Sequence, residues 1–209
     1  MKIIFSLIAT CMTAGCSVVG QSDVENAPYE LIRADVEQQI EVRNYDSMIL
    51  VSTDMLNEGQ NNAFRKLFGY ITGNNKGSTN IAMTAPVIMG NSDDSNKGDE
   101  ISMTAPVFMK ENANSPVMSF VMPKDFTLAS TPEPTDPNVW VSEIKDYKVA
   151  VIQFSGTLSD SNVDEHTSLL LEWIADNGYI ATSDAVKAGY NGPLTIPLFR
   201  RNEVLIEIQ

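Results

Sequence analysis

The chain has 209 residues, which is enough for one sizeable domain or at most two small ones. Apolar residues make up 43% of it and charged residues 20%, which is the composition of an ordinary globular protein. Its formal net charge of −13 comes without a basic stripe, so nucleic acids and anionic lipid surfaces are poor candidate partners.

The amino terminus has the pattern of a secretory signal. Lys2 supplies a positive start, and residues 3–8 form an apolar run that is too short to span a bilayer. The stretch MTAGC at 12–16 resembles the lipobox of bacterial lipoproteins, in which the cysteine becomes the acylated first residue of the mature protein. The alternative is an ordinary secretory signal in which Cys16 occurs by chance.

The lipobox predicts how the first 28 residues are organised and where the protein is located. Residues 1–16 would be the signal peptide, with Cys16 as the lipid-carrying first mature residue, and residues 17–28 would form a flexible tether. Because Cys11 leaves with the signal, the mature chain has no thiol pair and hence no disulfide framework. We expect a lipid-anchored protein of a bacterial cell envelope, on the outer membrane or facing the periplasm, held by more than one acyl chain.

Two consecutive strands are predicted at the start of the domain. In QIEVRNYD (39–46) the side chains alternate, with Ile40, Val42 and Asn44 on one face. MILVSTDM (48–55) is rich in β-branched residues and predicts the second strand.

A helix is predicted next. Asn57 and Gln60 have the spacing of a capping box at its start, and Gly73 would end it. Apolar residues recur between them at the helical spacing i, i+3, i+4, i+7, and these are Phe64, Leu67, Phe68 and Ile71. Arg65 and Lys66 lie on the opposite, polar face, so we expect an amphipathic helix whose apolar stripe packs on the core.

The chain then repeats itself. IAMTAPVIM (81–89) and ISMTAPVFM (101–109) flank GNSDDSNKGDE, which has the composition of a loop. The copies would be paired strands of one hairpin or two walls of one site. We favour the hairpin and leave open a secondary role as a cleft wall. One face would carry Met83, Met89, Met103 and Met109. Proline cannot donate to a ladder, so Pro86 and Pro106 predict that each copy is an edge strand or carries a bulge.

The second half follows the same order as the first. The predicted elements are strands at 116–123, 139–144 and 147–156, a helix at 160–176 that ends at Asn177–Gly178, and strands at 179–190 and 202–208. The inward face of the helix would consist of Val163, Leu170, Trp173 and Ile174. This order favours a pseudo-symmetric α+β domain in which the sheets curl together and two helices cover them.

Several short segments of the chain occur in an order that one family shares. They are MTAPV at 83–87 and again at 103–107, FVMP at 120–123, PEPTDPNV at 132–139, AGYNGP at 188–193 and RRNEV at 200–204. In this order they resemble the SOUL heme-binding proteins, and the resemblance, from Tyr29 to Ile208, implies one domain over residues 29–209.

The resemblance implies both a fold and an activity. The fold is α+β, a distorted antiparallel β-barrel of two pseudo-symmetric halves flanked by two main helices. The activity is non-covalent binding of heme or a related tetrapyrrole in a hydrophobic cleft, for transport, buffering or storage, and without catalysis.

The resemblance does not bring an iron ligand with it. In the animal member, an axial histidine lies in a segment similar to EVRNYD (41–46), and the matching residue here is Asn44, which cannot take that role. Other members lack this histidine and hold heme by apolar contacts and by salt links to its propionates. This chain resembles that second type.

Candidate iron ligands are few. His166 is the only histidine, and on the apolar side of its helix it could bind iron or pack its ring under the sheet. We favour packing. Met83 and Met103 carry soft thioethers that could bind iron or line a cleft, but methionine also fills cores, and we favour the core for each of them.

Cations near an apolar wall are candidates for binding propionates. Arg65 and Lys66 stand beside two phenylalanines on the first helix, and Arg200 and Arg201 open the last strand. For the second pair, an ion pair with Glu203 is the alternative. The full set of residues expected at the cofactor site is Asn44, Phe64, Arg65, Lys66, Phe68, Met83, Met103 and Arg200.

Enzymatic motifs are missing from the sequence, which has no nucleophile elbow, no phosphate-binding glycine loop and no histidine cluster for zinc. Two alternatives to heme binding remain. One is a binding module for another hydrophobic small molecule, since similar two-half barrels bind drugs in regulators. The other is an enzyme acting on a tetrapyrrole or a lipid.

Overall fold

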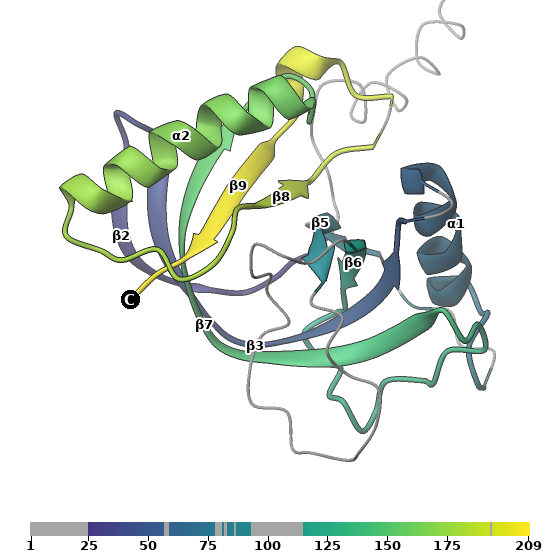
Figure 1. Cartoon of the computed structure of the whole chain (residues 1–209). Coiled ribbons are helices and arrows are strands. Elements are labelled where there is room, and N and C mark those ends of the chain that lie inside the picture. The colour runs from purple at the N-terminus through teal and green to yellow at the C-terminus, as the bar shows by residue number, and fades with distance from the viewer. Residues whose placement is uncertain are drawn as a thin grey trace, which may run out of the picture.

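The computed structural model describes residues 25–56, 59–77, 81, 83–85, 87–92, 115–192 and 194–209 (Figure 1). The predicted signal peptide with Cys16, most of the tether, and the second copy of the repeat with Met103 lie outside these residues. The strands are β1 (Glu25–Asn26), β2 (Glu30–Asp35), β3 (Ile40–Asp54), β4 (Thr84–Ala85), β5 (Val87–Ser92), β6 (Ser115–Val121), β7 (Val139–Phe154), β8 (Val186–Gly189) and β9 (Asn202–Glu207). The helices are α1 (Gly59–Ile71), α2 (Asp160–Asp176) and a short 3-10 turn, η1 (Pro197–Phe199).

Antiparallel strands close into a barrel. Their order is β3-β6-β5-β8-β9-β7, and β7 pairs with β3 to complete the ring, while β2 is added beside β3. The first half runs β3, α1, β5, β6 and the second runs β7, α2, β8, β9, so the two halves share one order of elements (Figure 1). The predicted α+β barrel of two similar halves with two flanking helices is confirmed.

The frame of the barrel is one pair of long strands. β3 and β7 pair in one register from Ile40 opposite Ile152 to Thr53 opposite Val139, with a gap at Asp46 and Asp146, and both bend strongly (Figure 1). The sequence predicted two strands in each of these places, which is wrong because the pairing runs through the bend. At the bend Asp146 has a positive φ of 51°.

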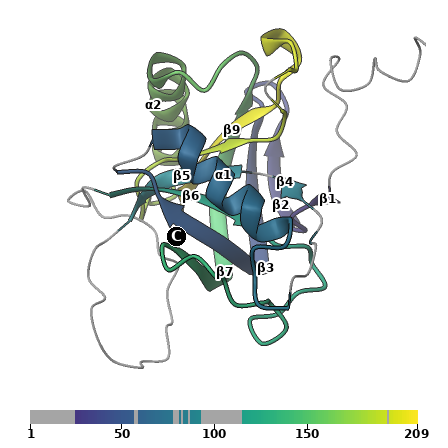
Figure 2. The same cartoon turned by 90° about the vertical axis from the view of Figure 1, so that its right-hand side faces the viewer.

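Buried apolar side chains form separate clusters inside and outside the barrel. The inner cluster draws on every barrel strand and includes Leu50, Val151 and Leu205. A second cluster lies between the barrel and α1, and a third lies between the barrel and α2. Each helix therefore covers one outer face of the barrel (Figure 2).

Helix α1 is rotated relative to the prediction. Its buried residues are Ala63, Leu67, Tyr70 and Ile71. Phe64 and Phe68, which were predicted to face the core, are 37% and 47% exposed. Tyr70 can take an inward position because its hydroxyl donates a hydrogen bond to the carbonyl of Pro132 at 2.6 Å. The prediction of which face of α1 is buried was therefore wrong, and two phenylalanines lie on the surface.

Helix α2 follows the prediction closely. Leu170, Trp173 and Ile174 are buried against the barrel, and Val163 packs at the edge of the same cluster. The helix ends at Asp176, where Asn177 caps it and Gly178 adopts a φ of 76°. In the described part of the chain, neither main helix combines the length and the apolar character needed to cross a membrane.

The first copy of the repeat is divided between two strands. β4 ends at Ala85 and β5 begins at Val87, and Pro86 between them lies outside the described residues. β5 pairs with β6 along its length and with β8 over Val87–Met89, so the alternative of an edge strand is wrong for this copy, and that of a bulge stays a prediction. The predicted partner, 101–109, lies outside the described residues.

Candidate functional site

A largely apolar cleft of about 530 Å³ lies between the beginnings of the two helices. We call it the α1 cleft. It is lined by Gln60, Asn61, Phe64, Val87, Met89, Met118, Thr157, Leu158, Ser159, Gly189 and Asn191. The first turn of α1 and the segment before α2 thus contribute to one lining.

The floor of the α1 cleft is the outer surface of three neighbouring strands. Met89 of β5 lies directly opposite Met118 of β6, and Val87 of β5 lies directly opposite Gly189 of β8. A Cβ atom at position 189 would stand 3.1 Å from a methyl carbon of Leu158, so a glycine there allows the wall to approach the floor closely. The floor carries two thioethers.

The walls of the α1 cleft come from α1 and from the segment before α2. Phe64 packs edge-on against Phe120 with ring centroids 5.4 Å apart, and it stacks with Phe68 at 6.0 Å. The side-chain amide of Gln60 donates a hydrogen bond to the sulfur of Met89 at 3.1 Å. Phe64 is thus fixed on one side while its other side borders the cleft.

A lysine that the sequence analysis did not select lies next to Met89 of the cleft floor, although it is not itself one of the lining residues. Lys187 is the register partner of Met89, and residues directly opposite each other share one face of an antiparallel sheet. Its neighbours Val186 and Ala188 point into the barrel, which turns Lys187 outward. Its side chain is 22% exposed, and its Nζ lies 3.7 Å from Asp160. The alternation of side chains along β8 could have identified Lys187, but only once β8 was known to pair with β5.

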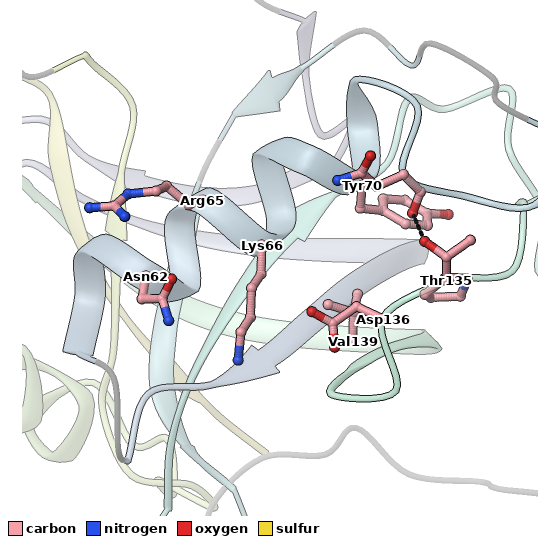
Figure 3. A pocket seen from close by; sticks show the side chains of 9 residues that line it. Asn62, Arg65, Lys66, Tyr70, Thr135, Asp136 and Val139 are labelled. Carbon is pink, nitrogen blue, oxygen red and sulfur yellow. Dashed lines mark hydrogen bonds between the residues drawn. The ribbon is translucent and has the colours of Figure 1, made fainter.

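The predicted cations of the first helix belong to a different hollow. Arg65 and Lys66 line a polar pocket of about 470 Å³ together with Tyr70, Thr135 and Asp136. Figure 3 shows the two side chains leaving α1 in different directions. The structure therefore separates Arg65 and Lys66 from the methionine floor, and it brings Phe64 to that floor.

The other predicted residues are dispersed. Met83 packs in the core layer under α1. Asn44 lies on β3 between Glu30 and Lys148, on the same face as Val42, which α2 covers.

His166 is part of the packing of α2. Its ring stacks on Phe154 with centroids 4.1 Å apart. Its Nδ1 lies 2.7 Å from the carbonyl oxygen of Asn162, which requires Nδ1 to carry the proton and donate it. These contacts fit the packing role that the sequence favoured.

The two C-terminal arginines take different partners. The Nε of Arg200 donates to the carbonyl of Thr195 at 2.8 Å. Arg201 donates to the carboxylate of Glu203 at 2.7 Å. The alternative of pairing with Glu203 therefore holds for Arg201.

Glu203 is the centre of a charged cluster inside the barrel. It is fully buried, and Arg43 of β3, itself 2% exposed, donates to both of its oxygens at 2.9 and 3.0 Å. The hydroxyl of Tyr190 donates to it at 2.5 Å. Burial alone would raise the pKa of Glu203, but the hydrogen bonds and charges of Arg43 and Arg201 outweigh it and hold this pKa below its ordinary value. No sequence pattern indicated that Arg43 lies inside the barrel.

No group of three or more His, Cys, Asp or Glu side chains that could hold a metal ion is present among the residues that the structure describes.

Comparison with solved structures identifies similar folds. The C-terminal domain of EcmrR matches with a TM-score of 0.54 and 16% identity, over 82% of this chain and 97% of that one. An uncharacterized conserved protein from Listeria innocua matches with a TM-score of 0.56 and 11% identity, over 82% and 93%. A protein of the same organism described as a hydrolase matches with a TM-score of 0.55 and 11% identity, over 82% and 92%. At these identities the likeness concerns the fold alone.

Comparison of sequences identifies the family. None of the curated protein sequences matches the chain at a significant level. The family model of the SOUL heme-binding proteins matches residues 24–207, which is nearly the whole chain and all of the barrel. The chain therefore belongs to the SOUL heme-binding protein family.

Proposed function

We propose that the α1 cleft binds heme or a related tetrapyrrole non-covalently, and that the protein is a binding protein rather than an enzyme. The observation that carries this proposal is the apolar floor of Val87, Met89 and Met118, on a chain of the SOUL family. A volume of about 530 Å³ lies within the usual range for ligand clefts, roughly 300–1,000 Å³.

The residues of the cleft fit the chemistry of such a ligand. Heme supplies a flat apolar macrocycle, two propionate carboxylates and an iron centre. Met89 and Met118 suit the macrocycle because unbranched thioether side chains conform to flat apolar surfaces. Phe64 would cover its edge, and Lys187 would bind a carboxylate.

We propose that any axial ligand to iron is weak or exchangeable. The residues lining the cleft include thioethers but no imidazole. Thioether sulfur is a soft ligand, and that of Met89 already accepts a hydrogen bond from Gln60. Apolar contacts and carboxylate contacts would therefore supply most of the affinity.

Titration with hemin tests the proposal, with two matched variants as the control. Phe64 and Phe68 stack on each other on the exposed side of α1, but only Phe64 lines the cleft. We expect a saturable Soret shift for the native chain, a clearly higher Kd for Phe64→Ala and a nearly unchanged Kd for Phe68→Ala. Equal losses in both variants, or no saturable binding by the native chain, would count against the cleft. Consumption of the pigment would indicate an enzyme.

We further propose that the mature chain is held in the bacterial cell envelope by lipid on Cys16. The motif MTAGC, with small residues directly before the cysteine, supports this. In cells, Cys16→Ser should release the protein from the membrane fraction and abolish incorporation of labelled fatty acid. Retention of the variant at the native level would sink the proposal.

A further inference from the structure

The connection between β8 and β9 carries an exposed group of apolar side chains. Leu194 and Leu198 are 84% and 71% exposed, and Ile196 and Phe199 are 45% and 47% exposed. We call these four residues the apolar tip. In Figure 1 its 3-10 turn, in yellow, projects beyond the first turn of α2, and Figure 2 shows the same projection. Single exposed apolar residues are ordinary, whereas a contiguous group marks a contact surface.

Hydrogen bonds hold the backbone of the tip in place. The N–H of Gly156 donates to the carbonyl of Pro197 at 2.8 Å, which ties the tip to the end of β7. The Nε of Arg200 donates to the carbonyl of Thr195 at 2.8 Å, and Thr195 itself is buried. The apolar side chains are therefore presented on a fixed backbone.

Charge is excluded from the tip. Residues 188–199 contain no charged side chain, although charged residues make up 20% of the chain. Arg200 and Arg201, which follow directly, are held by Thr195 and by Glu203. A short apolar segment without charge is the pattern of a segment that enters the boundary of a bilayer, because its apolar side chains can reach the acyl region.

The sequence between the domain and Cys16 also points to a bilayer. Nine residue steps separate Cys16 from Glu25, where β1 begins, and such a segment spans at most about 30 Å. If Cys16 is acylated, the domain cannot move far from the lipid surface. Acyl attachment is strengthened by a second contact with the membrane, and the tip has the chemistry for one.

We propose that the apolar tip inserts into the surface of a lipid bilayer and holds the α1 cleft beside it. Gly189 and Asn191, which precede the tip on the same connection, line that cleft. With a net charge of −13, the protein should favour uncharged over anionic lipid. This inference goes beyond ligand binding, and it needs neither heme nor the acyl anchor to be tested.

A polarity-sensitive dye at the tip tests insertion directly. The full chain carrying Cys11→Ser and Cys16→Ser has no native thiol, so a cysteine introduced by Leu198→Cys is labelled alone. Val36→Cys is the matched control, because Val36 is 85% exposed and lies by the opposite end of α2, where Asp35 accepts a hydrogen bond from Trp173. With phosphatidylcholine vesicles, we expect the dye at 198 to shift to the blue and to be quenched by brominated lipid, while the dye at 36 does neither.

Other occupants of the tip give different results, each of which overturns the proposal. Equal responses at 198 and 36, or no response at 198, exclude insertion of the tip. A blue shift that follows protein concentration without vesicles indicates a second copy of the chain. A blue shift that requires hemin and not lipid indicates that the tip folds over the cleft.

A second variant separates insertion from ligand binding. Leu194→Ser with Leu198→Ser should abolish the vesicle-dependent response of a dye placed at position 196 by Ile196→Cys, and should leave the Kd for hemin in solution unchanged. A raised Kd with an intact lipid response would show that the tip serves the cleft and not the membrane.

Discussion

Helices α1 and α2 occupy equivalent places in the two halves, since each follows a long strand and precedes two shorter ones. The hollow beside α2, of about 400 Å³, is lined in part by Asp35, Glu172 and Asp176. The α1 cleft instead has a floor of methionine and valine, and Lys187 lies on the same outer face of the sheet as Met89. A ligand with carboxylates and a flat apolar ring should therefore be repelled by the first hollow and favoured by the second.

The difference shows that duplicated topology does not duplicate a site. Both halves use a helix to cover an outer face of the barrel, and the burial that stabilises each face is similar in kind. The two halves differ in the exposed side chains of their helices, which do not contribute to the buried clusters. On α1 that surface is apolar, through Phe64 and its neighbours, whereas on α2 it is acidic.

The largest effect should come from a contact that both halves share. Arg43 of the first half and Glu203 of the second form a fully buried ion pair. Removing one partner leaves a buried charge poorly compensated, so Arg43→Met should lower the free energy of unfolding by about 3–5 kcal/mol. Arg201→Met is the control, because its side chain is 34% exposed and the loss should be smaller. Urea denaturation measures both, and equal losses would contradict the central role of Arg43.

The same pair should make the barrel sensitive to acid. The pKa of Glu203 in the folded state lies below its ordinary value of 4.5, because Arg43 and Arg201 outweigh the effect of burial. The carboxylate therefore contributes stability that is complete above the unfolded pKa and is lost as pH falls through the folded pKa. Urea midpoints measured from neutral pH to about pH 3 should fall less steeply in Glu203→Gln than in the native chain.

The next effect compares the two helices by one substitution on each. Leu67 of α1 and Leu170 of α2 are both fully buried, and Leu→Ala at either should cost about 2–5 kcal/mol of stability. Only Leu67→Ala should also weaken hemin binding, because α1 forms a wall of the cleft. Urea denaturation and hemin titration of the two variants check this. If Leu170→Ala weakens hemin binding by the same amount, the two helix faces do not differ in ligand binding.

A smaller effect concerns the cation at the cleft. Lys187→Gln should weaken hemin binding by about 1–2 kcal/mol, the low end for a charged hydrogen bond because the lysine is partly exposed. Arg65→Gln with Lys66→Gln should weaken it less, since these side chains line the other pocket. The dimethyl ester of protoporphyrin, which has no free carboxylate, should bind the native chain and Lys187→Gln equally. If the native chain binds the ester more tightly than Lys187→Gln does, the role of Lys187 in binding a carboxylate is contradicted.

Sequence reasoning reached the fold more completely than the site. Order of elements and family motifs were sufficient for the barrel and for α2, whose inward stripe follows simple helical spacing. They were not sufficient for α1, because a buried tyrosine with a hydrogen-bonded hydroxyl took the place of a phenylalanine. The site depends on which strands become neighbours, and Lys187 beside Met89 is a product of the β5–β8 pairing that no local pattern contains.

The smallest effect should come from the only histidine. His166 stacks on Phe154 and donates its Nδ1 proton to the carbonyl of Asn162, so it belongs to the packed face of α2. His166→Ala would remove a stacking contact and one hydrogen bond, which costs about 1–2 kcal/mol of stability. The Soret maximum of the hemin complex should stay where it is, because the residues that line the cleft do not include this imidazole. If the variant instead loses a six-coordinate low-spin spectrum, the histidine binds iron, and the face of α2 would be the functional one.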